Sequence, residues 1–557
     1  MTDIFSWSEE ENLIGQRTRR VLRVLSSSSE SETGEQDISQ LQENNGNQFT
    51  SPDPFVNICW SHQNLNPKVH NFDDIDSGCK AALDNTSKPL DYFQLFFPES
   101  LVNFIVNETN KYHNYSKKKC TWKSNSRINS WYDTNVDEIY CCLSTVLLMS
   151  RVKKLSYPEY WSKDKFMKTD IFHDIMSRDR FLNLMHCLHF SNPEVLNCRD
   201  KLFKIRELND RFRSILKQNF YPFKNICIDE SLLLFKGRLS FKQFIPSKRN
   251  RFGIKSFTAC DCKTGYILDM IVYSGSETEI SVFQENLGKS GNIVMTLMKD
   301  YLGKGHSLYV DNWYTSPLLF NTLHLNQTNS CGTVRKNRKY VPIIPNKLQK
   351  GEISFRSTET LLCMKWQDKR KVWMLTSIHH ADIVETRKIY YLINTPVTKP
   401  TCVQDYNRNM GAADKTDKVI STVECIRKSY KWYTKFFFHL LDISIWNAYA
   451  LYKYVSGQEI KFATFHLLLI KQIVGKYLRN SNTYKGKRNT DDPLRLVERH
   501  FPSTYFNPSA RKKNQTRKCV VCTKHKIRRE SRYECKKCDV GLCVDPCFQI
   551  FHTQIDY

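Results

Sequence analysis

The C-terminal end of the sequence carries the pattern that most restricts how this chain can fold. Eight Cys and His side chains fall within 34 residues there. They are Cys519, Cys522, His525, Cys535, Cys538, Cys543, Cys547 and His552. Tetrahedral Zn²⁺ takes four such ligands, so the set predicts two interleaved Zn²⁺ sites in a cross-brace module. A segment this short buries too little apolar surface to fold alone, and metal binding would supply the folding energy.

Disulfides are the alternative use for these cysteines. The sequence has 20 Cys but no apolar signal segment at its N-terminus, where three consecutive Glu residues occur instead. That usage indicates a reducing compartment, in which thiols stay free or bind metal. No membrane association is expected, because the richest apolar run, 436–452, is interrupted by Asp442 and other polar residues.

Charge points to the kind of partner. Lys and Arg total 83 against 57 Asp and Glu, a net charge of +26. Residues 1–90 hold 14 acidic and 7 basic side chains, a net −7 that leaves +33 for the rest. A body this basic attracts a polyanion, most commonly nucleic acid, and the nucleus is then the expected location. The alternative is a basic protein without such a partner.

The acidic N-terminal end predicts a disordered tail over residues 1–89. Ser26 to Ser29 are followed by a mixture of Glu and Ser with no buried periodicity. Serines beside acidic residues suit an acid-directed kinase, so phosphorylation of this Ser/Glu run is expected.

The middle of the chain predicts an α/β sheet. Helical periodicity over 91–221 gives way to strand patterns between 225 and 333. The expected order is a strand at 226–235, a hairpin of 254–260 and 266–273, a helix at 292–302, a strand at 306–311 and a helix at 317–325. Three strands, a helix, a strand and a helix describe a sheet of the ribonuclease-H type.

Four aspartates stand where this framework could gather them. Asp229 and Asp311 each follow a buried strand pattern, and Asp414 and Asp417 lie three apart at a helix start, hence on one face. Carboxylate oxygens suit Mg²⁺ or Mn²⁺, and two such ions assist phosphodiester cleavage by activating the attacking oxygen and stabilising the leaving one. The alternative for each Asp singly is a turn or capping role.

Basic and aromatic residues near these segments are candidate DNA contacts. Cations bind phosphates, and Arg can also read a base edge. The candidates are Lys236, Arg238, Asn312, Arg335, Lys336, Arg338, Trp432, Arg511, Lys512, Lys513, Arg517 and Lys518. Trp432, between cations, could stack on an unpaired base. The alternatives are a solvated basic face for the cations and helix packing for Trp432.

Five segments carry a family resemblance. They are IDESLLLFKGR (228–238), KRNRFGIK (248–255), YVDNWYTSPLLF (309–320), CGTVRKNRK (331–339) and DYNRNMGAADKTD (405–417). In this order they resemble piggyBac transposases, above all the vertebrate-type elements and the domesticated proteins derived from them, and the likeness extends from about residue 90 to the Cys-rich end.

The resemblance implies cut-and-paste transposition at TTAA sequences, through hairpin ends, by a ribonuclease-H-like catalytic domain. Asp229, Asp311 and Asp414 match the metal-binding aspartates of the family, and Asp417 matches an additional required one. Asn312, Arg335 and Arg338 match positions that handle the target or the transposon end. Here GAAD replaces the commoner GVD, so Ala413 stands for Val and the carboxylates are kept.

The same resemblance suggests a domain layout and a homodimer that pairs two DNA ends. The expected parts are the tail (1–89), a helical dimerisation and DNA-binding domain (90–223 and 425–500), the catalytic domain (224–333 and 401–424), a β-rich insertion (334–400), a basic linker (501–517) and the zinc module (518–557). In the family the matching module binds the terminal repeats, and the basic stretch before it serves nuclear import.

Three functions remain open from the sequence. The first is an active transposase, which the intact aspartate set favours. The second is a domesticated DNA-binding protein that kept the fold and lost catalysis. The third is a zinc-dependent ubiquitin ligase, since cross-brace modules also occur in that class.

Overall fold

The structure is a computed structural model that describes residues 58–195, 199–246, 251–344, 347–390, 395–425, 431–478, 500–506 and 515–554. The serine run at 26–32 therefore lies outside the described residues. Within the described residues, no helix is both long and apolar enough to cross a membrane.

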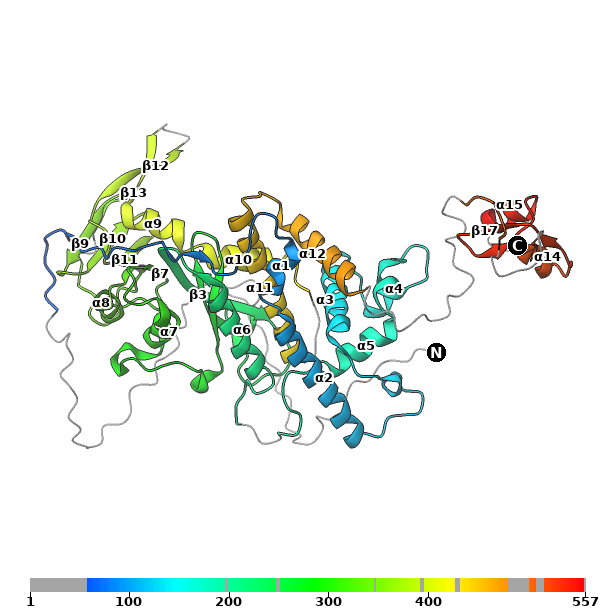
Figure 1. Cartoon of the computed structure of the whole chain (residues 1–557). Coiled ribbons are helices and arrows are strands. Elements are labelled where there is room, and N and C mark those ends of the chain that lie inside the picture. Colours follow the sequence, from blue (N-terminus) through cyan, green and yellow to red (C-terminus); the bar gives the residue numbers. More distant parts are fainter. Residues whose placement is uncertain are drawn as a thin grey trace, which may run out of the picture. The chain divides into compact units, whose positions relative to one another are not determined.

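The largest sheet of the described residues is mixed and has nine strands (Figure 1). Its strands are β3 (Asn225–Leu234), β4 (Gln243–Phe244), β5 (Phe252–Asp261), β6 (Ile267–Val272), β7 (Ser307–Val310), β8 (Asn329–Thr333), β9 (Ile353–Ser357), β10 (Leu362–Gln367) and β11 (Lys371–Thr376). Their order is β4-β5-β3-β7-β8-β11-β10-β9, with β6 also paired to β5. The β3–β7 and β7–β8 pairs are parallel, whereas the β3–β5 and β5–β6 pairs are antiparallel.

The sequence explains why strands β6 and β7 are buried. Every residue of β6 and β7 is buried, as expected for strands covered on both faces. Helix α7 (Gly288–Met298) precedes β7, and α8 (Pro317–Leu325) links β7 to β8. Ser316 caps α8 by accepting from the Leu319 amide, and Pro317 occupies its first turn. The predicted strands, hairpin and helices of 225–333 are thus confirmed to within a few residues.

The segment predicted as a β-rich insertion does not form a separate body. Strand β11 pairs with β8 through Thr376 and Cys331, so β9 to β11 extend the central sheet. Strands β12 (Ile383–Tyr390) and β13 (Thr395–Pro400) form a ribbon of their own. The open edge of β8 needs partners for its backbone groups, and β11 supplies them.

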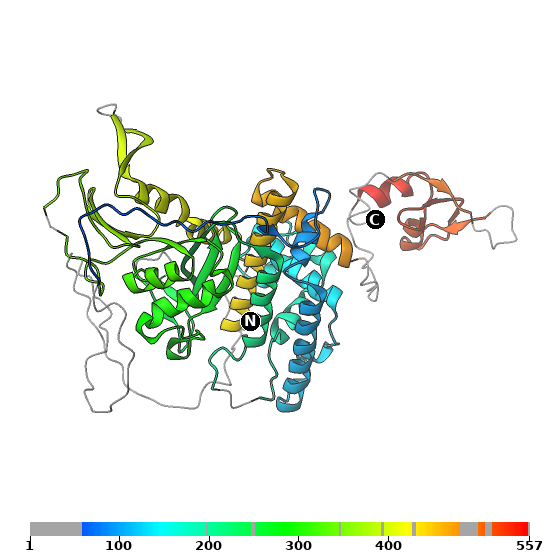
Figure 2. The same ribbon diagram turned by 60° about the vertical axis from the view of Figure 1, so that its left-hand side comes forward.

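Two stretches of helices that are far apart in sequence pack into one body, visible in both views (Figures 1 and 2). The first stretch contains α1 (Pro89–Gln94), α2 (Glu99–Lys119), α3 (Val136–Arg151), α4 (Ile171–Ile175), α5 (Arg178–Cys187) and α6 (Arg206–Asn219); the second contains α11 (Trp432–Ser456) and α12 (Phe462–Tyr477). Tyr140 stacks on Tyr477 at 4.1 Å between ring centroids, and the Leu90 amide donates to Gln472.

The helical body is joined to the sheet by a buried amide. Asn447 of α11 accepts a 2.9 Å hydrogen bond from the Ile267 amide and donates a 3.0 Å bond to the Ile267 carbonyl. Both backbone groups belong to the start of β6 and would otherwise be buried without partners.

The prediction of a disordered tail up to residue 89 is wrong for residues 58–89. This segment is extended and runs against the sheet (Figure 1). Ser61 bridges to Ser357, the His70 amide donates to Asn329, and β1 (Gly78–Cys79) pairs with β2 (Phe220–Tyr221). Low hydrophobicity favours disorder only where partners are absent, and here neighbouring strands and side chains satisfy the backbone of the segment.

The C-terminal module is small and built from short elements. They are β14 (Ser503–Thr504), β15 (Arg517–Lys518), α14 (Val520–Lys524), β16 (Glu530–Ser531), β17 (Tyr533–Cys535), β18 (Val540–Gly541) and α15 (Cys547–Thr553). Its buried core consists mostly of Cys with Val521, Leu542 and Phe551, so the apolar surface is limited, as the sequence predicts.

Candidate active site and metal centres

Asp229 and Asp311 lie side by side on neighbouring parallel strands. Ile228 of β3 pairs with Val310, the last residue of β7, and each of the two is followed in the chain by an aspartate. Adjacent strands are about 4.8 Å apart, and paired positions in parallel strands point to the same face. Both side chains are partly buried. The fold therefore gathers two carboxylates that are 82 residues apart in the sequence.

Helix α10 (Ala412–Ile420) brings the other two aspartates to this strand. The Ser231 hydroxyl donates a 3.0 Å hydrogen bond to Asp417 Oδ1. Ser231 lies two residues beyond Asp229 and hence on the same face of β3. Asp414 stands one turn earlier on the helix, on the face it shares with Asp417, and is exposed.

The electrostatics of this face favour a cation. Burial raises the pKa of Asp311 above its ordinary value, and the carboxylate of Glu230 raises it further. Glu230 is held by Lys255 at 2.6 Å. Hard oxygen donors crowded by like charge suit Mg²⁺ or Mn²⁺. Within the described residues, the groups of three or more Cys, His, Asp or Glu whose ligand atoms all lie within 4.8 Å of one another are the two Cys/His groups discussed below, so the carboxylates are spread more widely than that. A pair of ions about 3.5–4 Å apart needs such a wider set.

A second carboxylate network fixes helix α9 (Thr401–Asn409) against the strands. Asp405 Oδ2 accepts a 2.6 Å hydrogen bond from the Tyr309 hydroxyl, two residues before Asp311. His379 Nε2 lies 3.2 Å from the same oxygen, and Asn409 Nδ2 donates to Oδ1 at 3.0 Å. Burial acts to raise the pKa of Asp405, but the hydrogen bonds from His379 and Tyr309 outweigh it, and the pKa is lowered.

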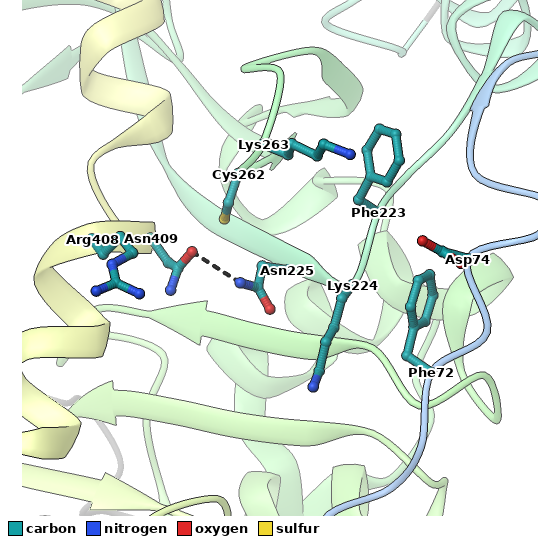
Figure 3. A pocket seen from close by; sticks show the side chains of 9 residues that line it. All are labelled: Phe72, Asp74, Phe223, Lys224, Asn225, Cys262, Lys263, Arg408 and Asn409. Carbon is teal, nitrogen blue, oxygen red and sulfur yellow. Dashed lines mark hydrogen bonds between the residues drawn. The ribbon is translucent and has the colours of Figure 1, made fainter.

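A cavity of about 590 Å³ opens at the amino end of β3 (Figure 3). It is lined by Phe72, Asp74, Phe223, Lys224, Asn225, Cys262, Lys263, Arg408 and Asn409. The bond from Asn225 Nδ2 to Asn409 Oδ1, drawn in the figure, measures 3.0 Å. Asp229 lies four residues further along β3, about 13 Å at the usual rise, so this cavity is not the carboxylate site.

Three of the predicted DNA contacts form one cluster beyond β7. Asn312 is exposed, and its Oδ1 accepts a 3.1 Å hydrogen bond from Arg335 Nε. Arg338 Nη2 donates to the backbone carbonyls of Asn312 and Trp313 at 2.8 and 2.6 Å. Arg338 therefore braces the loop that follows Asp311, while Arg335 and Asn312 face solvent.

The other predicted DNA contacts outside the zinc module differ in their surroundings. Lys236, Arg238 and Lys336 are exposed. Trp432 opens α11 and is partly buried, with its ring edge-on to Phe241 at 5.3 Å. The Trp432 ring therefore packs within the protein, and only its exposed part could stack on a base.

The first Cys/His group contains Cys519, Cys522, Cys543 and Cys547, all buried. Cys522 Sγ lies 3.9 Å from Cys543 Sγ and 3.5 Å from Cys547 Sγ. Four thiolates around one Zn²⁺ at about 2.3 Å have sulfurs roughly 3.8 Å apart, so the group fits a tetrahedral Zn²⁺ site.

The second group corrects the predicted ligand set. It contains His500, Cys535, Cys538 and His552. His500 Nδ1 lies 3.3 Å from Cys535 Sγ and 3.4 Å from Cys538 Sγ, and His552 Nε2 lies 3.6 Å from Cys538 Sγ. His552 Nδ1 lies 2.8 Å from the Phe548 carbonyl, a contact that turns Nε2 towards the site.

His525 is therefore wrong as a zinc ligand, and His500 takes the place assigned to it. The His525 side chain is exposed after α14, whereas His500 precedes β14 and enters the module from outside the predicted boundary at 518. The two groups alternate along the chain, so the cross-brace arrangement stands with a longer module.

The basic residues near the zinc module that were predicted to contact DNA also differ in their surroundings. Arg511, Lys512 and Lys513 lie outside the described residues. Lys518 is exposed. Arg517 is occupied within the module, because its Nη1 donates to Glu534 Oε2 at 3.2 Å and to Asp539 Oδ1 at 2.7 Å.

Sequence reasoning missed four residues of these sites: Glu230, His379, Asp405 and His500. Glu230 and Asp405 belong to the segments quoted for the resemblance, so their carboxylates were visible but had no assigned role. His500 stands 19 residues before Cys519, too far for a short spacing rule to include it. His379 carried no signal in the sequence.

Comparisons with known proteins agree with this arrangement. A family model described as Transposase IS4 matches residues 88–449, and one described as DDE_Tnp_1-like zinc finger matches residues 507–553. PiggyBac transposable element-derived protein 3 of Homo sapiens is 25% identical over 487 residues, 84% of this chain and 76% of that protein. The human protein 2 of the same series is 24% identical over 462 residues, 77% of this chain and 72% of that protein.

A solved structure is similar along nearly its whole length. The cryo-EM structure of the piggyBac transposase synaptic complex with hairpin DNA matches with a TM-score of 0.65 and 25% identity, and the match covers 84% of this chain and 97% of that one. With the Transposase IS4 model covering more than half of the residues, these likenesses show that the chain belongs to the piggyBac family of transposases.

Proposed function

We propose that the chain is a DNA transposase that excises and integrates DNA at TTAA sites with divalent metal ions held by Asp229, Asp311 and Asp414. The observation that carries the proposal is the register of β3 and β7. It sets Asp229 beside Asp311, while the Ser231–Asp417 hydrogen bond ties α10 to the same face. The strand order β6-β5-β3-β7-β8, with three antiparallel strands followed by two parallel ones, supports a ribonuclease-H-like catalytic domain.

The residues of the site would have different roles in strand cleavage and joining. Asp229, Asp311 and Asp414 would hold Mg²⁺ or Mn²⁺, which supplies activation of the attacking oxygen and charge stabilisation of the leaving one. Asp417 and Ser231 orient the helix relative to the strand. Glu230 is paired with Lys255, and its carboxylate is one of the groups that raise the pKa of Asp311. In the family, the attacking oxygens are water and then a DNA 3′ hydroxyl, which forms the hairpin end.

The basic surface would hold the nucleic acid. Arg335 and Asn312 are exposed directly beyond Asp311, in reach of a phosphate or base edge that enters the site. Lys236 and Arg238, exposed beyond the carboxyl end of β3, add phosphate contacts on the neighbouring strand. Transposon ends would be bound by the zinc module, and Trp432 would stack on the unpaired base of a hairpin.

Partners and location follow from the same chemistry. Two transposon ends must be paired, so a homodimer is proposed, and its substrate places the protein in the nucleus. The solved neighbour is by its title a synaptic complex with hairpin DNA, which supports DNA binding by the shared fold. Phosphorylation of the Ser/Glu run by an acid-directed kinase stays part of the proposal.

A second function is favoured by the names of the human relatives. Both are transposable element-derived proteins, so a member that binds DNA without cutting it is the competing proposal. The four aspartates and the register that joins them favour catalysis here. Ubiquitin transfer remains the third proposal and gains no support from these relatives.

The deciding experiment incubates the purified full chain with TTAA-flanked terminal repeats of its element and Mg²⁺ or Mn²⁺. Cleavage that is lost in Asp311→Asn and kept in Asp76→Asn supports the transposase. Asp76 is a matched control, because its side chain is 80% exposed and forms a surface ion pair with Lys80 at 3.9 Å. Binding without cleavage by the wild type would overturn catalysis and leave the DNA-binding protein.

A further inference from the structure

Two exposed phenylalanines pair on the segment that leads from β3 into β5. Phe244 and Phe252 are 53% and 43% exposed, and their ring centroids lie 4.6 Å apart. They are register partners in the β4–β5 ladder, so both rings stand on one face of it. Single exposed apolar side chains are common, but two large rings in contact with each other and with solvent indicate a binding surface.

The segment that carries the two rings has no acidic residue. Residues 236–252 contain six Lys or Arg side chains and no Asp or Glu. Lys236 and Arg251 are exposed, and Lys242 Nζ lies 5.8 Å from the centre of the Phe252 ring. Such a surface repels a second copy of itself and attracts a polyanion. Charge therefore favours nucleic acid over a symmetric protein partner.

The pair lies on the face of the sheet that carries the carboxylates. Asp229 of β3 is the register partner of Thr258 in β5, and residues an even number apart along a strand point to the same face. Phe252 is six residues from Thr258, so its ring shares the face of Asp229. At about 3.3 Å per residue the pair is roughly 20 Å from the carboxylates along β5. A DNA strand covers that distance with about six stacked nucleotides.

The same segment contacts the tryptophan predicted to stack on a base. Phe241, three residues before Phe244, is buried, and its ring is edge-on to Trp432 at 5.3 Å. The exposed pair is thus held by a segment that packs directly against Trp432.

The chemistry of a phenyl ring selects unpaired bases. The ring has no group that can hydrogen-bond to a phosphate or to a base edge, and it offers only a flat apolar face. In a duplex each base face is covered by its neighbours, whereas in a single strand it is open to stacking. Aromatic rings beside cations are how proteins hold single-stranded DNA without sequence preference.

We propose that Phe244 and Phe252 form a stacking site for unpaired DNA bases, which holds a single strand that extends from the carboxylate site. The inference rests on the proposed function, because that function makes DNA the substrate and opens its end at the carboxylates. Lys236, Lys242 and Arg251 bind the phosphates of the stacked strand.

The test measures binding of fluorescent oligonucleotides to the full chain with its zinc sites loaded and without Mg²⁺ or Mn²⁺. The double variant Phe244→Leu, Phe252→Leu keeps apolar side chains and loses both rings. It should bind a single-stranded oligonucleotide at least about fivefold more weakly than the wild type, the lower end of the effect of losing one base–aromatic stack. Its binding to a blunt duplex of the same sequence should be unchanged.

The length of an unpaired tail tests the position of the stacking site. A tail of about eight nucleotides on a duplex end spans the distance from the carboxylates to the rings, whereas a tail of about two does not. The double variant should bind the long-tailed end more weakly than the wild type does and the short-tailed end equally well.

Matched variants control for the ring and for exposure. Phe244→Tyr with Phe252→Tyr keeps both rings and should bind like the wild type. Phe283→Leu should leave all binding unchanged, because Phe283 is 39% exposed but stands between Glu279 and Glu285 in the sequence. Each single Leu variant should show part of the loss, which keeps the test decisive if the double variant unfolds.

The outcomes separate this inference from the proposed function. Equal weakening for single strands and duplexes, or no weakening for either, overturns the stacking site, while cleavage in the wild type and in Asp311→Asn tests the proposed function independently. A double Leu variant that binds single strands normally but sediments as a smaller assembly assigns the rings to a protein interface and also overturns the stacking site. A wild type that does not cleave removes the proposed function, and the metal-free binding still decides whether the rings stack on bases.

Discussion

Ser231 and Asp417 are 186 residues apart in the sequence, and their side chains meet in a 3.0 Å hydrogen bond from the Ser231 hydroxyl to Asp417 Oδ1. This contact joins strand β3, which carries Asp229, to helix α10, which carries Asp414. The candidate site therefore depends on how α10 is seated on the sheet as well as on the aspartates themselves.

Removing this contact should loosen the helix from the strand. Ser231→Ala is expected to lower the free energy of unfolding by about 1 kcal/mol, the net value of one hydrogen bond. It should also weaken Mn²⁺ binding, because Asp414 is no longer held in place; urea unfolding and Mn²⁺ titration measure the two effects. Ser421→Ala is the matched control, since Ser421 is exposed at the other end of α10 and its hydroxyl donates to the Lys418 carbonyl of the same helix. Equal Mn²⁺ affinity in both variants would contradict the seating role.

The Tyr309–Asp405 pair should prove energetically coupled. The hydroxyl of Tyr309 donates to a carboxylate whose pKa is lowered despite burial, which marks a charge-assisted hydrogen bond. A double-mutant cycle with Tyr309→Phe and Asp405→Asn should give a coupling free energy of about 1–2 kcal/mol. The cycle is measured by urea unfolding. Additive effects of the two substitutions would show that the contact holds neither α9 nor the strand.

The sequence predicts the middle of this fold well because local patterns determine it. Continuous apolar runs that end in an acidic residue marked β3 and β7, and their parallel register then places Asp229 beside Asp311. The pairing of β11 with β8 could not be foreseen, since it depends on an edge that exists only once the sheet has formed. The same holds for residues 58–89, whose polar sequence gives no periodicity and whose partners, such as Asn329, are supplied by distant elements.

In the zinc module, most of the ligands could be predicted from the sequence and one could not. Clustered Cys pairs predict ligands because short spacing lets them share one ion. An isolated His has no such local signal, and the choice between His500 and His525 is made by the tertiary fold. Chain proximity favoured His525, whereas strand β14 brings His500 to Cys535.

The ligand correction gives a direct prediction. His500→Ala should leave one Zn²⁺ firmly bound per chain and make the other easy to remove with a mild chelator, because three ligands hold Zn²⁺ less tightly than four. His525→Ala should keep both ions, since that side chain is exposed and outside the two groups. Zinc content after chelator challenge, measured by atomic absorption, decides between them. Loss of an ion from His525→Ala would restore the first assignment.

A buried acid in the helical body should make stability depend on pH. Asp442 of α11 is 2% exposed and accepts a 2.8 Å hydrogen bond from Cys425 Sγ; burial raises its pKa to about 8. Between an unfolded pKa of about 3.9 and that value, the folded chain keeps a proton that the unfolded chain releases. The wild type therefore loses stability as pH rises through this window, by at most about 1.4 kcal/mol per pH unit.

Asp442→Asn does not titrate, so its stability relative to the wild type should rise steadily between pH 4.5 and 7.5 in urea unfolding. Buried His439 titrates in both chains and cancels in the difference. A difference that stays constant with pH would show that Asp442 is ionised in the folded protein.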